Sequence, residues 1–201
     1  MKIFQDIFNN EELLSDSYPT VETFEGTIYE VRSRMVAKGE DVIDVGCGNA
    51  FGGVNEDEEQ GGSGGAPVEK VNDLVDAFQY GETSMDVDGF KDYFKGYMKK
   101  LLAHLKANKP ERVAAFTAGA SAFFKWAVAN FGELSFYTGK GYDCENMLVM
   151  SYYKKEEDEA PHFLYIIDGL KFYKVWFEFL YLYFIKYTSI DKTWYSNIYA
   201  S

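Results

Sequence analysis

The 201 residues of this chain are enough for one domain with a sizeable core, and a composition of 47% hydrophobic and 18% aromatic residues favours globular folding. The formal net charge of −12 argues against a surface that binds nucleic acid or an anionic membrane. Cys47 and Cys144 lie far apart without a Cys-x-x-Cys pair, which argues against a disulfide framework or a cysteine zinc site and fits a reducing compartment. No apolar run reaches the roughly 18 residues of a membrane span, and none at the N-terminus is typical of a secretory signal. We therefore expect a cytoplasmic protein.

The first third of the chain predicts short strands and one long loop. Residues 2–8 and 27–36 alternate apolar and polar side chains, and residues 41–45 are a further candidate strand. Residues 9–17 are predicted to form a polar turn rich in carboxylates. Residues 51–66 hold six glycines and the run Glu56, Asp57, Glu58 and Glu59. Because this segment buries too little apolar surface to offset its ordering entropy, we predict a mobile loop.

Residues 68–79 fit a helix or a strand, and this alternative stays open. Residues 86–131, in contrast, predict two amphipathic helices, because apolar side chains recur every three or four positions. In the first helix these are Phe90, Phe94, Tyr97, Leu101 and Leu105, and in the second Val113, Phe116, Ala120, Phe123 and Ala127. Pro110 cannot continue the first helix but suits the first turn of the second, so the chain must reverse there.

Three runs of aromatic and β-branched residues follow, at 134–138, 147–154 and 161–167, with a turn at 156–159. Strands before and after a helical hairpin indicate an α+β fold with segregated layers.

The hairpin is basic although the chain is acidic. Residues 85–131 hold eight basic and four acidic side chains, about +4 in charge, so the rest of the chain carries −16. Four lysines share one side of the first helix: Lys91, Lys95, Lys99 and Lys106. We expect this lysine face to contact acidic partners, the alternative being a solvated helix face.

The glycine turn from Asp44 to Asn49 resembles the first motif of S-adenosylmethionine-dependent methyltransferases. The third small position is Ala50 rather than a glycine that opens a helix, and an acidic loop follows instead of a helix. A methyltransferase is therefore the alternative function, and a strand that ends in a glycine turn is preferred.

Other motifs give no chemistry. Asp86 and Asp88 resemble the start of an EF-hand loop, but its twelfth position is Tyr97 rather than glutamate, so Asp86 is predicted to cap the helix. His104 and His162 have no second histidine or cysteine nearby, which argues against a metal site or a catalytic triad. His104 is expected at the surface. We predict no catalytic residue.

Several segments carry a family resemblance when they are taken together. They are MKIFQDIFNNEELLSDSY, GCGNA, KGYMKKLLAHLKANKPERV, FYTG, MSYYK and FLYIIDGL. In this order they resemble parts of the translationally controlled tumour protein family (TCTP, histamine-releasing factor or fortilin). These parts are the opening strand with its acidic turn, the first signature, the end of the first long helix with its Pro-Glu-Arg-Val corner, and the last three strands. The chain looks most similar to protist members, and it departs from the family pattern at Phe51 and Lys140.

The resemblance implies a single domain over residues 1–175. The fold would be a twisted β-tent of mostly antiparallel sheets, shared with a Rab-binding guanine-exchange module, from which the helical hairpin projects. It further implies a non-enzymatic, monomeric and mainly cytoplasmic adaptor, with non-classical secretion in some settings and links to growth and stress responses. No zinc site and no tightly bound cofactor are expected.

The partners implied by the resemblance are calcium, tubulin or microtubules, and a small GTPase. Glu12 occupies the place of the glutamate that the family ties to its GTPase role. Weak calcium binding would fall to Glu56, Asp57, Glu58 and Glu59, and tubulin to the lysine face. The family's anti-apoptotic segment would lie near residues 16–27, where Pro19 and sparse apolar residues argue against that activity.

Residues 176–201 lie beyond the usual end of the family. Ten of these 26 residues are aromatic, with two acidic and two basic residues besides, which is typical of an aggregation-prone segment. Because Tyr, Phe, Ile and Lys dominate what AT-rich DNA encodes, we expect a gene-model artefact, such as translation of an intron or untranslated region. The alternative is an extra strand or an extension outside the body.

Overall fold

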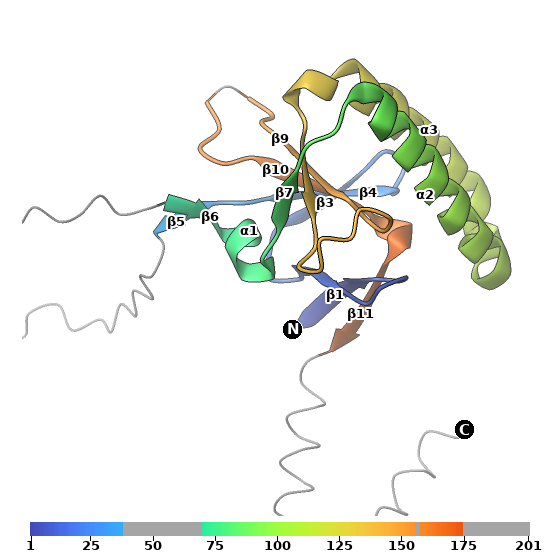
Figure 1. Cartoon of the computed structure of the whole chain (residues 1–201). Coiled ribbons are helices and arrows are strands. Elements are labelled where there is room, and N and C mark those ends of the chain that lie inside the picture. The colour runs from blue at the N-terminus through green and yellow to red at the C-terminus, as the bar shows by residue number, and fades with distance from the viewer. Residues whose placement is uncertain (38–69, 156, 175–201) are drawn as a thin grey trace, which may run out of the picture.

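The computed structural model describes residues 1–37, 70–155 and 157–174 (Figure 1). Its strands are β1 (Lys2–Asp6), β2 (Glu12–Ser15), β3 (Thr20–Thr23), β4 (Ile28–Arg32), β5 (Met35–Ala37), β6 (Lys70–Asn72), β7 (Gly81–Thr83), β8 (Ser135–Thr138), β9 (Val149–Tyr152), β10 (His162–Ile166) and β11 (Leu170–Lys174). Its helices are α1 (Asp73–Phe78), α2 (Val87–Asn108) and α3 (Val113–Ala129), with 3-10 turns η1 (Pro110–Arg112), η2 (Phe131–Glu133) and η3 (Ile167–Gly169). The order of strands, helical hairpin and strands confirms the predicted α+β fold.

Antiparallel sheets form the body of the described chain. The largest has the strand order β3-β4-β10-β9-β8-β7, and a second has the order β11-β1-β2 (Figure 1). β5 and β6 form a separate two-stranded ribbon. In the second sheet Lys2 pairs with Lys174 and Phe4 with Phe172, so the first strand lies beside the last described one.

The hairpin of α2 and α3 lies along one flank of the sheets (Figure 1). Nine of the ten apolar side chains that the sequence predicted to face inward are buried: Phe90, Phe94, Tyr97, Leu101 and Leu105 on α2, and Phe116, Ala120, Phe123 and Ala127 on α3. The tenth, Val113, is half-buried against the same core. The predicted cap is confirmed as well, because the Asp86 side chain accepts a hydrogen bond from the Gly89 backbone N–H at 2.8 Å. Within the described residues no helix is long and apolar enough to cross a bilayer.

Aromatic contacts fasten α3 to the body. Phe24, in the turn after β3, lies 5.3 Å from Phe123 and 5.8 Å from Trp126, and Trp126 packs edge-on against Tyr152 of β9 at 5.1 Å. Gly119 faces the same turn, where a Cβ would collide with the Thr27 hydroxyl and the Phe24 carbonyl. The close approach of α3 to this turn therefore requires glycine at position 119.

The predicted polar turn at residues 9–17 was wrong in part, because β2 lies within it. Leu13, Leu14 and Ser15 are buried, and Leu14 pairs with Phe4 of β1. The carboxylates that favoured a turn, Glu12 and Asp16, are exposed at the two ends of this strand. Pairing with β1, which no local pattern shows, overrides the polar composition.

Other predicted boundaries shifted. The described part of the segment 68–79 combines both alternatives, since β6 runs directly into α1 and the Asn72 side chain caps that helix. The predicted strand at residues 27–36 is divided into β4 and β5. β3, β7 and β11 were not predicted from the residue pattern. The predicted strand at 41–45, the loop at 51–66 and residues 176–201 lie outside the described residues.

Candidate functional site

The lysine face lies on the exposed side of α2, as the sequence predicted. Lys91, Lys95, Lys99 and Lys106 are all exposed. Lys91 forms an ion pair with Asp88 one turn earlier, at 2.9 Å. Within the described part of the chain, no ion pair occupies Lys95, Lys99 or Lys106, so these three ammonium groups are available to a partner.

Lys100, next in sequence, has a structural role instead. Its ammonium group lies 4.1 Å from the centre of the Phe8 ring and donates a hydrogen bond to Asn146 at 2.6 Å. Tyr93 donates to the Asn146 carbonyl at 2.8 Å and accepts from the Leu148 N–H at 2.7 Å. These contacts tie α2 to the N-terminal turn and to the segment before β9.

Beside the lysine face, α2 and α3 enclose a groove of about 550 Å³, here called the outer groove. Apolar side chains form its floor: Phe94, Met98 and Leu102 from α2 and Phe116, Ala120 and Phe124 from α3. Lys91, Lys95 and Lys99 line its α2 side, and Thr117 and Ser121 its α3 side. The sequence predicted the lysine face but not the groove beside it.

The two glutamates of the N-terminal acidic turn differ in environment. Glu12 is exposed on β2 and accepts a hydrogen bond from the Tyr173 hydroxyl at 2.5 Å. Glu11 turns the other way and accepts from the Gly141 backbone N–H and from the Asn9 amide. A Cβ at Gly139 or Gly141 would collide with the Glu11 carboxylate. Glu11 therefore fastens the loop after β8, whereas the Glu12 carboxylate faces solvent.

Beneath this turn lies Asp6, a carboxyl that is almost fully buried. Burial raises its pKa above the ordinary value, and the hydrogen bonds from the backbone N–H groups of Phe8 and Met147 partly offset that effect. The sequence did not single Asp6 out, because nothing local indicates that Met147 would lie over it.

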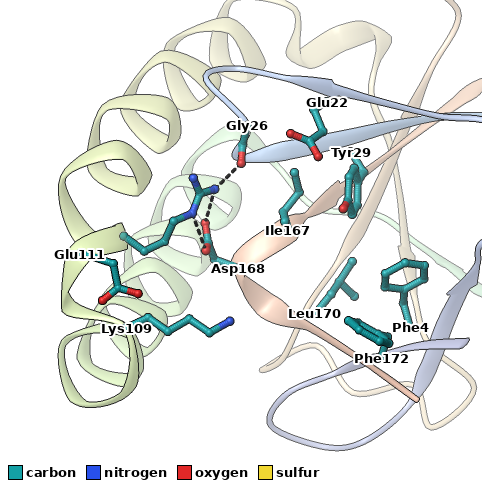
Figure 2. Close-up of a pocket in the computed structure, with 11 residues that line it drawn as sticks. Phe4, Glu22, Gly26, Tyr29, Lys109, Glu111, Ile167, Asp168, Leu170 and Phe172 are labelled. Atoms are coloured by element: carbon teal, nitrogen blue, oxygen red, sulfur yellow. Dashed lines mark hydrogen bonds and ion pairs between the residues drawn. The ribbon is translucent and has the colours of Figure 1, made fainter. Parts of the chain in front are cut away.

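The corner between α2 and α3 is held to the body by an ion pair (Figure 2). Arg112 donates two hydrogen bonds to the Asp168 carboxylate, at 3.0 and 3.1 Å, and a third to the Gly26 carbonyl. Asp168 is nearly buried, and its hydrogen bonds raise the pKa of Arg112. Arg112 and Asp168 come from two segments of the family resemblance, PERV and IIDGL. The sequence therefore contained a signal for this contact, but not the pairing itself.

This corner borders a second cavity, of about 400 Å³. Figure 2 shows an apolar wall on β1, β4 and β11 facing the polar side chains of the corner, Lys109 and Glu111, with Glu22 at the other end. The charges on this cavity are of both signs and define no single ligand.

His104, expected at the surface, is half-buried. Its ring packs edge-on against Phe8 at 6.1 Å, and its Nδ1 is buried. The prediction was wrong because Phe8, in the turn after β1, covers this side of α2. The His162 Nδ1 lies 2.9 Å from the Oε1 atom of Glu30. The Lys154 ammonium group contacts the same oxygen at 2.7 Å.

In the described parts of the chain, no group of three His, Cys, Asp or Glu side chains could hold a metal ion. Glu56, Asp57, Glu58 and Glu59, the predicted calcium run, lie outside the described residues. The glycine turn from Asp44 to Asn49 lies outside them as well.

A family model described as translationally controlled tumour protein matches residues 1–171. The translationally controlled tumour protein homolog 1 of Dictyostelium discoideum is 40% identical to this chain over 174 residues, which are 85% of this chain and 98% of the relative. The Plasmodium chabaudi chabaudi homolog is 39% identical over 175 residues, with 85% and 97% covered.

Solved structures are similar as well. The tumour-associated protein p23fyp from Schizosaccharomyces pombe superposes with a TM-score of 0.66 at 34% identity, over 87% of this chain and 99% of that one. The Caenorhabditis elegans protein superposes with a TM-score of 0.55 at 24% identity, over 87% and 98%, and supports the fold alone.

Proposed function

Because this chain belongs to the translationally controlled tumour protein family, we propose that it is a non-enzymatic adaptor that binds acidic partners, tubulin among them, through the lysine face. One observation carries this proposal. In a chain of net charge −12, Lys95, Lys99 and Lys106 stand exposed in a row on α2, without an ion pair in the described structure. A row of free cations on a rigid helix suits acidic, flexible segments such as tubulin tails.

Tubulin co-sedimentation tests this contact. The double variant Lys95→Glu/Lys99→Glu should bind several-fold more weakly, because two attractive contacts become repulsive. Wild-type binding should fall as salt rises, since the Debye length shrinks from about 10 Å at 0.1 M to about 3 Å at 1 M. Lys140→Glu/Lys155→Glu, a matched reversal of two exposed lysines elsewhere, should bind like the wild type. Equal binding by both double variants would refute the proposal.

We propose a separate surface for a small GTPase around Glu12. Support comes from its exposure on β2, where its hydrogen bond with Tyr173 lies at the surface, whereas the Glu11 carboxylate packs against Gly139 and Gly141. Glu12→Val should weaken the capture of small GTPases without a change in the thermal midpoint. Glu11→Gln should instead lower the midpoint, because it weakens the contact with the loop after β8. A loss of stability in Glu12→Val would show that Glu12 is structural.

Calcium binding is proposed as weak and located in the run from Glu56 to Glu59. A calcium titration followed by the NMR signals of individual backbone amides tests it. Signal shifts confined to other residues would show that calcium binds elsewhere. The cytoplasmic, monomeric state and the single domain over residues 1–175 are proposed on the same family basis.

The family match gives no support to the methyltransferase alternative. Calorimetry with S-adenosylmethionine separates the two functions. Micromolar binding that Gly46→Arg abolishes would contradict the adaptor function.

A further inference from the structure

A flexible acidic tail would contact the lysines of the outer groove but would leave its apolar floor uncovered. Met98, Leu102 and Phe124 are only partly buried by the hairpin itself. Together with buried Phe94, against which the Phe124 ring stacks at 5.1 Å, and buried Phe116, they form an apolar floor that draws on both helices. Apolar surface of this kind, rimmed by polar groups, is typical of a protein contact.

The two sides of the groove differ in charge. Lys91, Lys95 and Lys99 are spaced four residues apart, so their backbone positions follow one another at about 6 Å along the axis of α2. On the α3 side stand the neutral residues Thr117 and Ser121, and Lys125 is the one charged residue in the 17-residue sequence of α3. No acidic side chain lines the groove. The groove is therefore cationic along one side, neutral along the other and apolar at its base.

We propose that the outer groove binds an amphipathic helix of a partner protein. Its apolar stripe would lie on the floor, and acidic residues at four-residue spacing would face Lys95 and Lys99, the lysines of the groove that have no ion pair in the described structure. A third helix suits a groove between two helices, because its side chains enter at the same three- and four-residue spacings. The lysine row repeats at the spacing of one helix face, so a partner helix meets each ammonium group in turn.

Charge complementarity selects this partner over two others. A second copy that paired its hairpin with this one would set lysine against lysine, and like charges would oppose that contact. An anionic membrane would be repelled by the acidic body beside the hairpin. The inference rests on the proposed function, because Lys95 and Lys99 also belong to the tubulin contact, but it adds the apolar floor as a requirement.

A synthetic peptide tests the inference on the full chain. The probe is an amphipathic helix of about 18 residues, long enough to form a helix, with leucines along one stripe and a glutamate at every fourth position beside it. Ser121→Tyr places a large side chain at the edge of the groove, and Lys95→Glu/Lys99→Glu reverses its charge. Each should weaken peptide binding by roughly tenfold or more, measured by fluorescence anisotropy.

Matched controls separate this groove from the tubulin contact. Ala122→Tyr adds the same side chain at an exposed position of α3 that does not line the groove, and Lys106→Glu reverses a lysine of the face outside the groove. Both should bind the peptide like the wild type. Ser121→Tyr should leave tubulin binding unchanged, whereas Lys106→Glu should weaken it, so the failure of one proposal can be told from the failure of the other.

Three results would overturn the inference. One is equal binding of a peptide whose leucines are replaced by glutamine, because charge alone would then suffice. The second is a Ser121→Tyr variant that keeps its unfolding midpoint and still binds the peptide fully. The third is the absence of peptide binding in a chain that instead self-associates or binds vesicles of anionic phospholipid.

Discussion

Arg112 fixes the position of the hairpin corner. Its guanidinium reaches one carboxylate with two donors and one carbonyl with a third, a geometry that the single ammonium of lysine cannot reproduce. Asp168 is nearly buried, so the loss of Arg112 would leave a carboxylate without its cation.

Arg112→Lys and Asp168→Asn should each destabilise the protein by about 2 kcal/mol, because each leaves a largely buried polar group incompletely paired. Urea denaturation measures this. Arg32→Lys, at an exposed arginine of β4, is the control and should change the free energy of unfolding by less than about 0.5 kcal/mol. Equal losses of unfolding free energy in Arg112→Lys and Arg32→Lys would show that the contact of Arg112 with Asp168 stabilises the protein no more than an exposed arginine does.

Asp6 gives stability a pH dependence of definite sign. Burial raises the pKa of Asp6 above its ordinary value of 3.8, so the fold favours the protonated form. Its contribution is then fully present below pH 3.8 and is lost as pH rises through the raised pKa of the folded state. Asp6→Asn cannot ionise, so its stability relative to the wild type should improve as pH rises from about 3.8 upward. Urea denaturation of both proteins across this range decides the matter, and a constant or opposite difference would contradict it.

Between elements, α3 approaches the turn after β3 closely. Gly119 makes it possible, and the helix accepts glycine there although glycine disfavours a helix interior. A second helical glycine, Gly96 of α2, has nothing near the position of a Cβ.

These two glycines form a matched pair. Gly119→Ala should destabilise the protein by about 1–3 kcal/mol, because the new methyl group collides with backbone and a buried hydroxyl. Gly96→Ala should stabilise it by about 0.5–1 kcal/mol through helix propensity. Thermal unfolding of both variants is the measurement, and the same sign for both would contradict the packing argument.

For the whole molecule, β11 closes the described chain onto β1. Cutting after Lys174 keeps every pair of that ladder, so the thermal midpoint should stay within about 3 °C. Cutting after Ile167 removes β11 together with Asp168 and should abolish cooperative unfolding.

An intact mass near 23.0 kDa for the native protein would contradict the gene-model artefact that the sequence suggested for residues 176–201, whereas a chain that ends near residue 175 would support it.

The sequence predicted the hairpin well and the sheets less well. Helix periodicity is local, so the inward side chains and the Asp86 cap could be identified directly. β2, β3, β7 and β11 are three to five residues long and depend on distant partners, which leaves little local signal.

For the same reason, only part of the candidate site could be predicted from the sequence. The exposed lysines follow from the helix period, but the contact of Glu11 with Gly141 spans 130 residues and that of Arg112 with Asp168 spans 56. The outer groove needed the relative placement of two helices, which periodicity alone does not give.

The intrinsic fluorescence of Trp126 can report whether the hairpin is packed against the body. Its indole packs against Phe24 and Tyr152 of the body, and the other two tryptophans of the sequence, Trp176 and Trp194, follow Lys174. A chain cut after Lys174 is thus a single-tryptophan protein with an intrinsic fluorophore at the joint between hairpin and sheet. If α3 lifts from the body, water reaches the indole and its emission moves to longer wavelength, so partner binding and hairpin displacement can be followed in one label-free titration.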